Sequence, residues 1–313
     1  MIRRIYRFIQ IMFPVFPAQI ATASMFASSY LVLAGLVLPK RIHAGELIAG
    51  SLSMLLFSLQ LRACDELKDE QSDRANFPSR PLVTGVATTA DVRALLAACA
   101  SALIALNAPF FGRPAVVSMF AVVMTYSFLM WRWFFAEKTI RASLPLAFLT
   151  HHPIVFLLQF YLLAFFSDSI GALFRHPLHA YAFVFGVALA ATAWEISRKI
   201  RGTLDETDYA TYSKVWGAKP AALVLAAVVI ASLGSAFSGV HGQTLGPLVR
   251  TVWALPMIAA IRVILRLARF VRNPLKTPQL KALVESYSML LLCAALVTGL
   301  YALCSPYGST ALR

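Results

Sequence analysis

The sequence predicts an all-α, polytopic membrane protein with nine transmembrane helices in one bundle and a cytoplasmic N-terminus. Three observations lead to this prediction. Hydrophobic residues make up 59% of the 313 residues, charged residues only 13%, and the mean hydropathy is +0.72. Apolar runs reach the ~20 residues that a spanning helix needs. Lys and Arg gather in the short segments between these runs. Length alone suggests about two domains, but this composition favours a single membrane domain over residues 1–313.

The elements follow in order along the chain. Residues 1–13 alternate Arg with Ile, Tyr and Phe, which predicts a basic amphipathic helix lying on the membrane surface. The eighth apolar run carries three arginines in its second half, and these are expected to reach the membrane interface from one end of the helix. The predicted spans are residues 14–38, 44–64, 91–111, 115–135, 143–166, 178–194, 220–240, 247–270 and 286–304.

The chain holds 28 Lys+Arg against 14 Asp+Glu. A basic excess is also typical of nucleic-acid-binding proteins, but here the bases lie between the spans, where they determine topology. We therefore expect no nucleic-acid partner. The positive-inside rule places the N-terminus and the polar segments 65–90 and 195–219 in the cytoplasm, and the C-terminus outside. The expected location is the bacterial cytoplasmic (inner) membrane. The four cysteines form no CxxC pair, so neither zinc nor a disulfide framework is indicated.

Three carboxylates recur every fourth residue after the second span: Asp65, Asp69 and Asp73. On a helix this spacing puts them on one slowly drifting face. They repel one another unless a cation lies between them, and carboxylate oxygens suit Mg²⁺, which completes its shell with substrate phosphates. Arg74 and Arg80 follow and are placed to hold such a phosphate from the other side. The alternative is a solvated acidic helix end.

The second polar segment begins with Glu195 at the end of an apolar run. Arg198 (i+3) and Lys199 (i+4) are spaced to pair with it within one helix. Alternatively, Glu195 is a metal ligand and the two bases bind phosphate oxygens. Asp205 lies beyond a glycine on an expected loop, where it is a ligand, part of a loop-ordering pair, or solvated; the sequence leaves all three open.

A third cluster closes the fourth span. Tyr126 and its neighbouring tryptophans indicate an interfacial aromatic belt; alternatively, Arg132 among these aromatics reaches a diphosphate. His151, early in the fifth span, has no metal-binding spacing. A satisfied polar group inside the bundle is its default interpretation, and lining of a pocket is the alternative.

Nine spans, with Asp65, Asp69 and Asp73 followed by Asn76, Arg80, Pro81, Leu82 and Gly85, resemble the UbiA-type intramembrane prenyltransferase superfamily. The second polar segment falls where that superfamily carries its second Asp-rich motif, and residues 212–217 resemble the close of that motif. The resemblance implies Mg²⁺-dependent transfer of a prenyl group from a polyprenyl diphosphate to an aromatic or lipid acceptor within the membrane. It also implies that the two polar segments cap the active site.

The resemblance assigns roles to particular residues. Asp65, Asp69 and Asp73 are implied as catalytic Mg²⁺ ligands, with Glu195 and Asp205 as further metal ligands. The implied diphosphate-binding residues are Arg74, Arg80, Arg132, Lys138, Arg198 and Lys199, and the implied pocket residues are Asn76, Tyr126, His151 and Tyr212.

One departure affects the metal count. The superfamily's second motif usually offers two Asp residues four positions apart, and these positions hold Glu195 and Lys199 here. A lysine does not hold Mg²⁺ but does hold a diphosphate oxygen. The second metal site is therefore lost, or rebuilt from Asp205 or Asp208.

Two rival functions stay open: a membrane transporter, and a non-catalytic lipid-diphosphate-binding member of the same fold. A CDP-alcohol phosphotransferase is disfavoured, because its D-G-x-x-A-R sequence is missing upstream of Asp65.

Overall fold

The computed structural model describes residues 1–241 and 246–304, and within them it contains helices and no strand. Nine helical segments in this part of the chain are long and apolar enough to cross a membrane, which confirms the predicted number of spans. Their bounds are Val15–Val37, Ala44–Asn76, Thr89–Phe110, Pro114–Trp131, Leu144–Ala164, Leu178–Ser197, Ala218–His241, Pro247–Arg272 and Leu280–Cys304. The α-helices within them are α2 (Ile20–Val32), α3 (Ala44–Asn76), α4 (Thr89–Asn107), α5 (Pro114–Trp131), α7 (Leu144–His151), α8 (Ile154–Ala164), α10 (Leu178–Ser197), α12 (Ala218–His241), α13 (Pro247–Arg272) and α14 (Leu280–Cys304).

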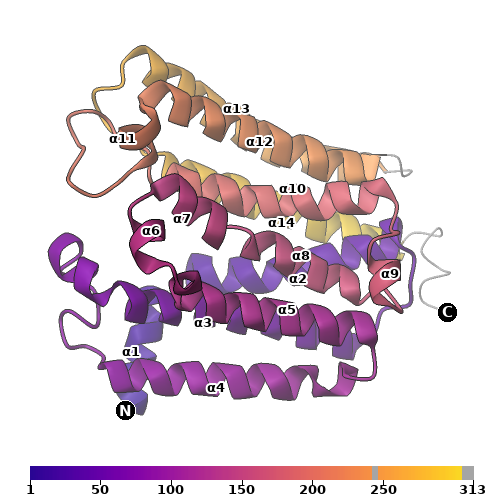
Figure 1. Cartoon of the computed structure of the whole chain (residues 1–313). Coiled ribbons are helices and arrows are strands. Elements are labelled where there is room, and N and C mark those ends of the chain that lie inside the picture. Colours follow the sequence, from indigo (N-terminus) through magenta and orange to yellow (C-terminus); the bar gives the residue numbers. More distant parts are fainter. Residues whose placement is uncertain (242–245, 305–313) are drawn as a thin grey trace.

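The long helices run side by side, and the short helices gather at their ends (Figure 1). Helices α1 (Ile2–Met12), α6 (Glu137–Arg141) and α11 (Tyr212–Trp216) lie at one end, which we call the polar end; α9 (Ile170–Leu173) lies at the other. Helix α1 crosses the direction of the long helices. Its Phe8 is buried, and Arg4 donates two hydrogen bonds to the Asp91 carboxylate, at 2.6 and 3.0 Å.

Helix α3 is longer than a membrane span. Its 33 residues extend ~50 Å at 1.5 Å per residue, whereas the hydrocarbon core is ~30 Å thick. The segment 65–90, predicted as a polar loop, is therefore helical as far as Asn76 and turns only from Phe77. The extension is stabilised by pairs one turn apart, including Arg62–Glu66 and Glu70–Arg74.

The ninth span begins at Leu280 rather than at 286 and the sixth ends at Ser197 rather than at 194, and the fourth and fifth spans differ for identifiable reasons. The fourth ends at Trp131 rather than at 135, because residues 133–135 adopt positive φ values of 50–59° and break the helix. The fifth is divided into α7 and α8 at Pro153, which has no N–H to continue the ladder.

Helices α10 and α12 pack in close contact because glycines face the partner backbone. A Cβ on Gly186 would lie 2.3 Å from the Ala236 nitrogen, and one on Gly239 would lie 2.7 Å from the His179 carbonyl oxygen. Such small residues let membrane helices approach closely. Hydrogen bonds reinforce the contact: Ser232 donates to the Gly186 carbonyl at 2.7 Å, and Tyr287 of α14 donates to Ser232 at 2.8 Å.

A buried ion-pair network closes the end opposite the polar end. The Glu46 carboxylate, at the start of α3, accepts hydrogen bonds from Tyr30, Lys40 and Arg113, each at 2.6 Å. Lys40 and Arg113 also donate to the Phe165 carbonyl just past the end of α8. The network thereby joins α2, α3, α5 and α8, and it borders a cavity of about 640 Å³. Burial lowers the pKa of Lys40 from its ordinary value, although Glu46 opposes the change.

Candidate active site

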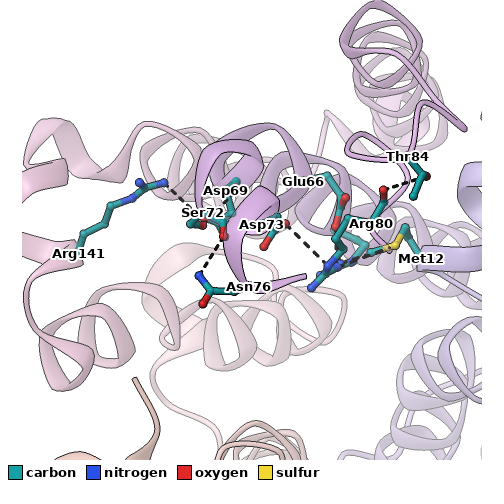
Figure 2. A network of polar contacts seen from close by, with 10 residues as sticks. Met12, Glu66, Asp69, Ser72, Asp73, Asn76, Arg80, Thr84 and Arg141 are labelled. Carbon is teal, nitrogen blue, oxygen red and sulfur yellow. Dashed lines mark hydrogen bonds and ion pairs between the residues drawn. The ribbon is translucent and has the colours of Figure 1, made fainter. Parts of the chain in front are cut away.

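Three carboxylates at four-residue spacing lie along one face of α3 where the helix reaches the polar end, and Figure 2 shows two of them, Asp69 and Asp73. We call Asp65, Asp69 and Asp73 the α3 face. A different base approaches each of them. Lys68 Nζ lies 2.9 Å from Asp65 Oδ1, Arg141 Nη2 lies 3.4 Å from Asp69 Oδ1, and Arg80 Nε lies 3.8 Å from Asp73 Oδ2. The predicted acidic face is therefore present, and bases surround it.

Glu66 anchors one edge of this arrangement, and the sequence analysis did not single it out. Its side chain is 2% exposed and lies 2.6 Å from both the Arg62 and the Arg80 guanidinium groups. The sulfur of Met12, at the end of α1, contacts the same two guanidinium groups at 4.0 and 3.9 Å. Because Glu66 holds Arg80, the predicted diphosphate-binding Arg80 lies beside Asp73 rather than in solvent (Figure 2).

Trp133 forms a platform beside the α3 face. Its positive-φ backbone turns the chain after α5, and its ring receives Lys68 Nζ at 4.6 Å and Arg141 Cζ at 5.1 Å from the centroid. Such cation–π contacts orient the two bases toward the carboxylates. Arg141 also donates to the Lys68 carbonyl at 2.8 Å. The sequence analysis assigned neither Lys68 nor Arg141 to the site; Lys68 had a local signal, since it lies at i+3 from Asp65.

The predicted bases of the third cluster lie elsewhere. Arg132 is exposed, with its guanidinium group over the Trp131 and Phe135 rings. Lys138 is exposed on α6 and makes no ion pair with any described residue. Arg141, one turn farther along α6, is the base of this segment that reaches the α3 face.

The second polar segment begins on the last turn of α10. Glu195 accepts Arg198 Nε at 2.6 Å and lies 3.0 Å from Lys199 Nζ; we call these three residues the Glu195 cluster. Arg198 lies over the Trp194 ring and Lys199 over the Tyr212 ring, at 5.1 and 5.7 Å from the centroids. Partial burial disfavours the charge of Arg198, but Glu195 outweighs burial and, with a smaller contribution from Asp65, holds the pKa of Arg198 above its ordinary value.

The loop that follows is ordered by its own acidic residues. Asp205 accepts the Thr277 N–H at 2.7 Å, and hydrogen bonding from the Thr277 side chain and then its backbone holds the pKa of Asp205 below its ordinary value. Glu206 accepts hydrogen bonds from the hydroxyls of Thr211 and Ser213. These contacts support the loop-ordering alternative for Asp205.

Aromatic contacts bring the two polar segments together. Phe77, just past the end of α3, packs edge-on against Tyr209 of the second segment, with ring centroids 5.3 Å apart. Phe148 of α7 packs edge-on against Tyr212 at 5.9 Å. These contacts place the chain just past α3 beside segment 195–219, so that the α3 face and the Glu195 cluster lie at the same end of the bundle.

The remaining predicted residues make contacts away from the α3 carboxylates. Arg74 pairs with Glu70 at 2.8 Å and is exposed, and Asn76 donates to the Ser72 carbonyl at 2.9 Å. Tyr126 donates to the Thr150 carbonyl at 2.8 Å. His151 packs edge-on against Trp133, its centroid 4.9 Å away, and its Nε2 is buried with no hydrogen-bond partner among the described residues.

The available carboxylate oxygens determine where a hard cation such as Mg²⁺ could bind. Asp65 and Asp69 offer carboxylate oxygens on side chains that are 44% and 34% exposed, and oxygen is the donor that Mg²⁺ prefers. Glu195 and Asp205 do not fit, because two bases occupy the first and a backbone N–H the second. Within the described ranges, no three His, Cys, Asp or Glu side chains converge as a finished metal site. The α3 face therefore offers, at Asp65 and Asp69, carboxylates that are more exposed than that of Glu195, and each of its carboxylates is met by one base rather than two.

Comparison with known proteins gives two informative matches, both to solved structures. A UbiA homolog from Aeropyrum pernix K1 superposes with a TM-score of 0.62 at 18% identity, over 88% of this chain and 97% of that one. A digeranylgeranylglyceryl phosphate synthase superposes with a TM-score of 0.60 at 14% identity, over 95% of this chain and 99% of that one. No family model and no curated protein sequence matches the chain.

Proposed function

Since the chain has the fold of UbiA-type intramembrane prenyltransferases, we propose that it transfers a prenyl group from a polyprenyl diphosphate to an aromatic or lipid acceptor in a Mg²⁺-dependent reaction. One observation carries the proposal: a face of three carboxylates, each met by a base, lies where a bundle of nine apolar helices ends. This arrangement suits a ligand with a phosphate head and an apolar chain.

Asp65, Asp69 and Asp73 are the proposed metal ligands. Mg²⁺ bound there would neutralise the charge that develops on the leaving diphosphate. The bases around the face would neutralise the same charge. Once Mg²⁺ is the counter-ion of the carboxylates, Lys68, Arg80 and Arg141 are within reach of phosphate oxygens.

The reaction breaks the allylic C–O bond, and the electron pair leaves with the diphosphate oxygen. The electron-deficient allylic carbon then forms a bond to the acceptor, which loses a proton. The Trp133 ring lies beside Lys68 and the Tyr212 ring beside Lys199, and aromatic faces of this kind stabilise a passing cation. Exclusion of water by the bundle favours the acceptor over hydrolysis.

The polar end is proposed to face the cytoplasm of a bacterium, because Lys and Arg are more frequent at that end.

A transporter is the rival function. Transporters carry ionisable groups near the bilayer midplane, whereas the polar contacts between α3, α4 and α8 here come from uncharged Ser53, Asn107 and Tyr161. This difference favours the transferase.

The test is diphosphate release by the purified protein in detergent, with Mg²⁺ or EDTA. Geranyl, farnesyl and longer prenyl diphosphates are offered with a panel of aromatic and lipid acceptors. Asp69→Asn is the test variant, and Glu70→Gln, whose carboxylate pairs with exposed Arg74, is the matched control. Mg²⁺-dependent release that only Asp69→Asn abolishes supports the proposal. If the donor binds but no donor–acceptor pair releases diphosphate, the chain is a non-catalytic member. If the donor is neither bound nor cleaved, the transporter is favoured.

A further inference from the structure

We propose that the Glu195 cluster is a metal-free clamp for the diphosphate: Arg198 and Lys199 bind its oxygens, Glu195 holds the two bases in place, and Mg²⁺ enters only at the α3 face. This inference rests on the proposed function and specifies how its substrate is held.

The charge of the cluster supports the clamp. One carboxylate faces two cations, at 2.6 and 3.0 Å, so the group carries a net charge of +1. A divalent cation bound to Glu195 would lie beside both bases and be repelled by them. A diphosphate is attracted to the same place, since charge-assisted bonds from Arg and Lys are those that phosphate oxygens accept best.

The other acidic residues of segment 195–219 do not complete a metal site. Asp205 is bound to the loop before α14 through Thr277, and Glu206 is bound to two hydroxyls of its own loop. Asp208 is exposed on the same loop. Rebuilding a second metal site from these residues would require breaking the contacts that order the loop.

The two bases are held in place and keep hydrogen-bonding N–H groups available for a ligand. Arg198 uses Nε for Glu195, which leaves both terminal nitrogens of its guanidinium group for a ligand. Lys199 is fixed through its backbone, because its carbonyl accepts the Tyr212 N–H at 2.9 Å. The Tyr212 ring under Lys199 also packs against Phe148 of α7, and Tyr209 of the same segment packs against Phe77 just past α3, so the clamp and the α3 face lie at the same end of the bundle. One diphosphate is therefore able to contact the metal on one side and the clamp on the other.

The experiment counts metal ions directly. Purified chain is dialysed to equilibrium against Mn²⁺ and inorganic pyrophosphate, and bound manganese and phosphorus are measured per chain. We expect Glu195→Gln to leave the manganese count of the parent unchanged and Asp69→Asn to reduce it. We expect Lys199→Asp, which puts a second carboxylate beside Glu195, to raise the count by one.

Pyrophosphate affinity gives the second readout. Arg198→Gln and Lys199→Gln are each expected to weaken pyrophosphate binding roughly 10- to 100-fold, the value of one charge-assisted bond, with the manganese count unchanged. Lys219→Gln removes the same charge from an exposed position at the start of α12 and is expected to have little effect. A lower manganese count in Glu195→Gln, or unchanged pyrophosphate affinity in both cluster variants, overturns the clamp while leaving the transferase in place. Absence of any pyrophosphate binding to the parent overturns the proposed function and the clamp with it.

Discussion

Arg80 lies in the turn after α3, and its guanidinium group returns to Glu66 on the preceding turns of that helix, 14 residues earlier, at 2.6 Å. The pair fixes the turn against the helix and holds Arg80 beside Asp73. A buried carboxylate with two guanidinium partners thus organises the entrance to the proposed site.

Glu66→Gln is expected to destabilise the protein by about 3 kcal/mol, because it leaves Arg62 and Arg80 without their common counter-ion. The unfolding midpoint in detergent measures the change. Glu70→Gln, which breaks the exposed pair with Arg74, is expected to cost less than about 1 kcal/mol. Equal midpoints for the two variants would contradict the anchoring role of Glu66.

Arg141→Met is expected to strengthen metal binding and to weaken binding of the prenyl diphosphate donor. Without Arg141, Asp69 loses a counter-ion and should bind Mn²⁺ roughly threefold to tenfold more tightly in the absence of donor. The same variant should raise the donor KM about tenfold, since a phosphate contact is lost. Lys138→Met, in the same short helix, is the matched control. Weaker Mn²⁺ binding in Arg141→Met would show that Arg141 does not act as a counter-ion.

Arg4→Gln is expected to loosen α1 without unfolding the bundle. The Arg4–Asp91 pair is bidentate, but Arg4 is about half exposed, so its loss should weaken the attachment of α1 without destabilising the other helices. Hydrogen exchange of residues 2–12 would then be about fivefold faster, measured by mass spectrometry. Arg3→Gln, at the neighbouring exposed position, should leave exchange unchanged; a similar acceleration in both variants would attribute the effect to net charge.

Gly186→Ala is expected to destabilise the protein by about 1–3 kcal/mol, the usual cost of overpacking, because its Cβ would meet the α12 backbone. Gly234→Ala, where a Cβ would meet nothing within 4 Å, is the control and should be neutral or slightly stabilising. Thermal unfolding of both variants measures the difference, and a stable Gly186→Ala would refute the close approach of α10 and α12.

Membrane orientation is tested by labelling single cysteines in intact cells with an impermeant maleimide. Both test positions are introduced into a Cys293→Ser, Cys304→Ser variant, which lacks the two exposed cysteines. Ser169→Cys, before α9, should be labelled from outside, whereas Ser79→Cys, at the polar end, should require permeabilisation. The reverse pattern would place the proposed site outside the cytoplasm.

Much of the fold could be predicted from the sequence because spanning helices depend on local properties. A run of ~20 apolar residues crosses a membrane whatever its neighbours are, and all nine runs are helices in the described residues. The ends of these helices were less predictable. The continuation of α3 to Asn76 depends on ion pairs among residues that hydropathy alone assigns to a loop.

The site was predictable where its geometry is helical. Asp65, Asp69 and Asp73 share a face because of their spacing, and the pairing of Glu195 with Arg198 and Lys199 follows the same rule. Arg141 was missed because it reaches Asp69 across 72 residues of sequence, through a turn at Trp133 that no local pattern predicts. The tertiary structure, and not the local sequence, determines that Arg141 rather than Lys138 or Arg132 reaches the α3 face.

The network around Glu46 has a mechanical consequence for the whole bundle. It ties α2, α3, α5 and α8 together at the end far from the proposed site, and removing a partner from a buried ion pair is costly. Helices fastened at one end separate most easily at the other. The Glu46 network therefore acts as a fixed point for these four helices, so that any separation between them would be smallest beside Glu46 and largest at the polar end.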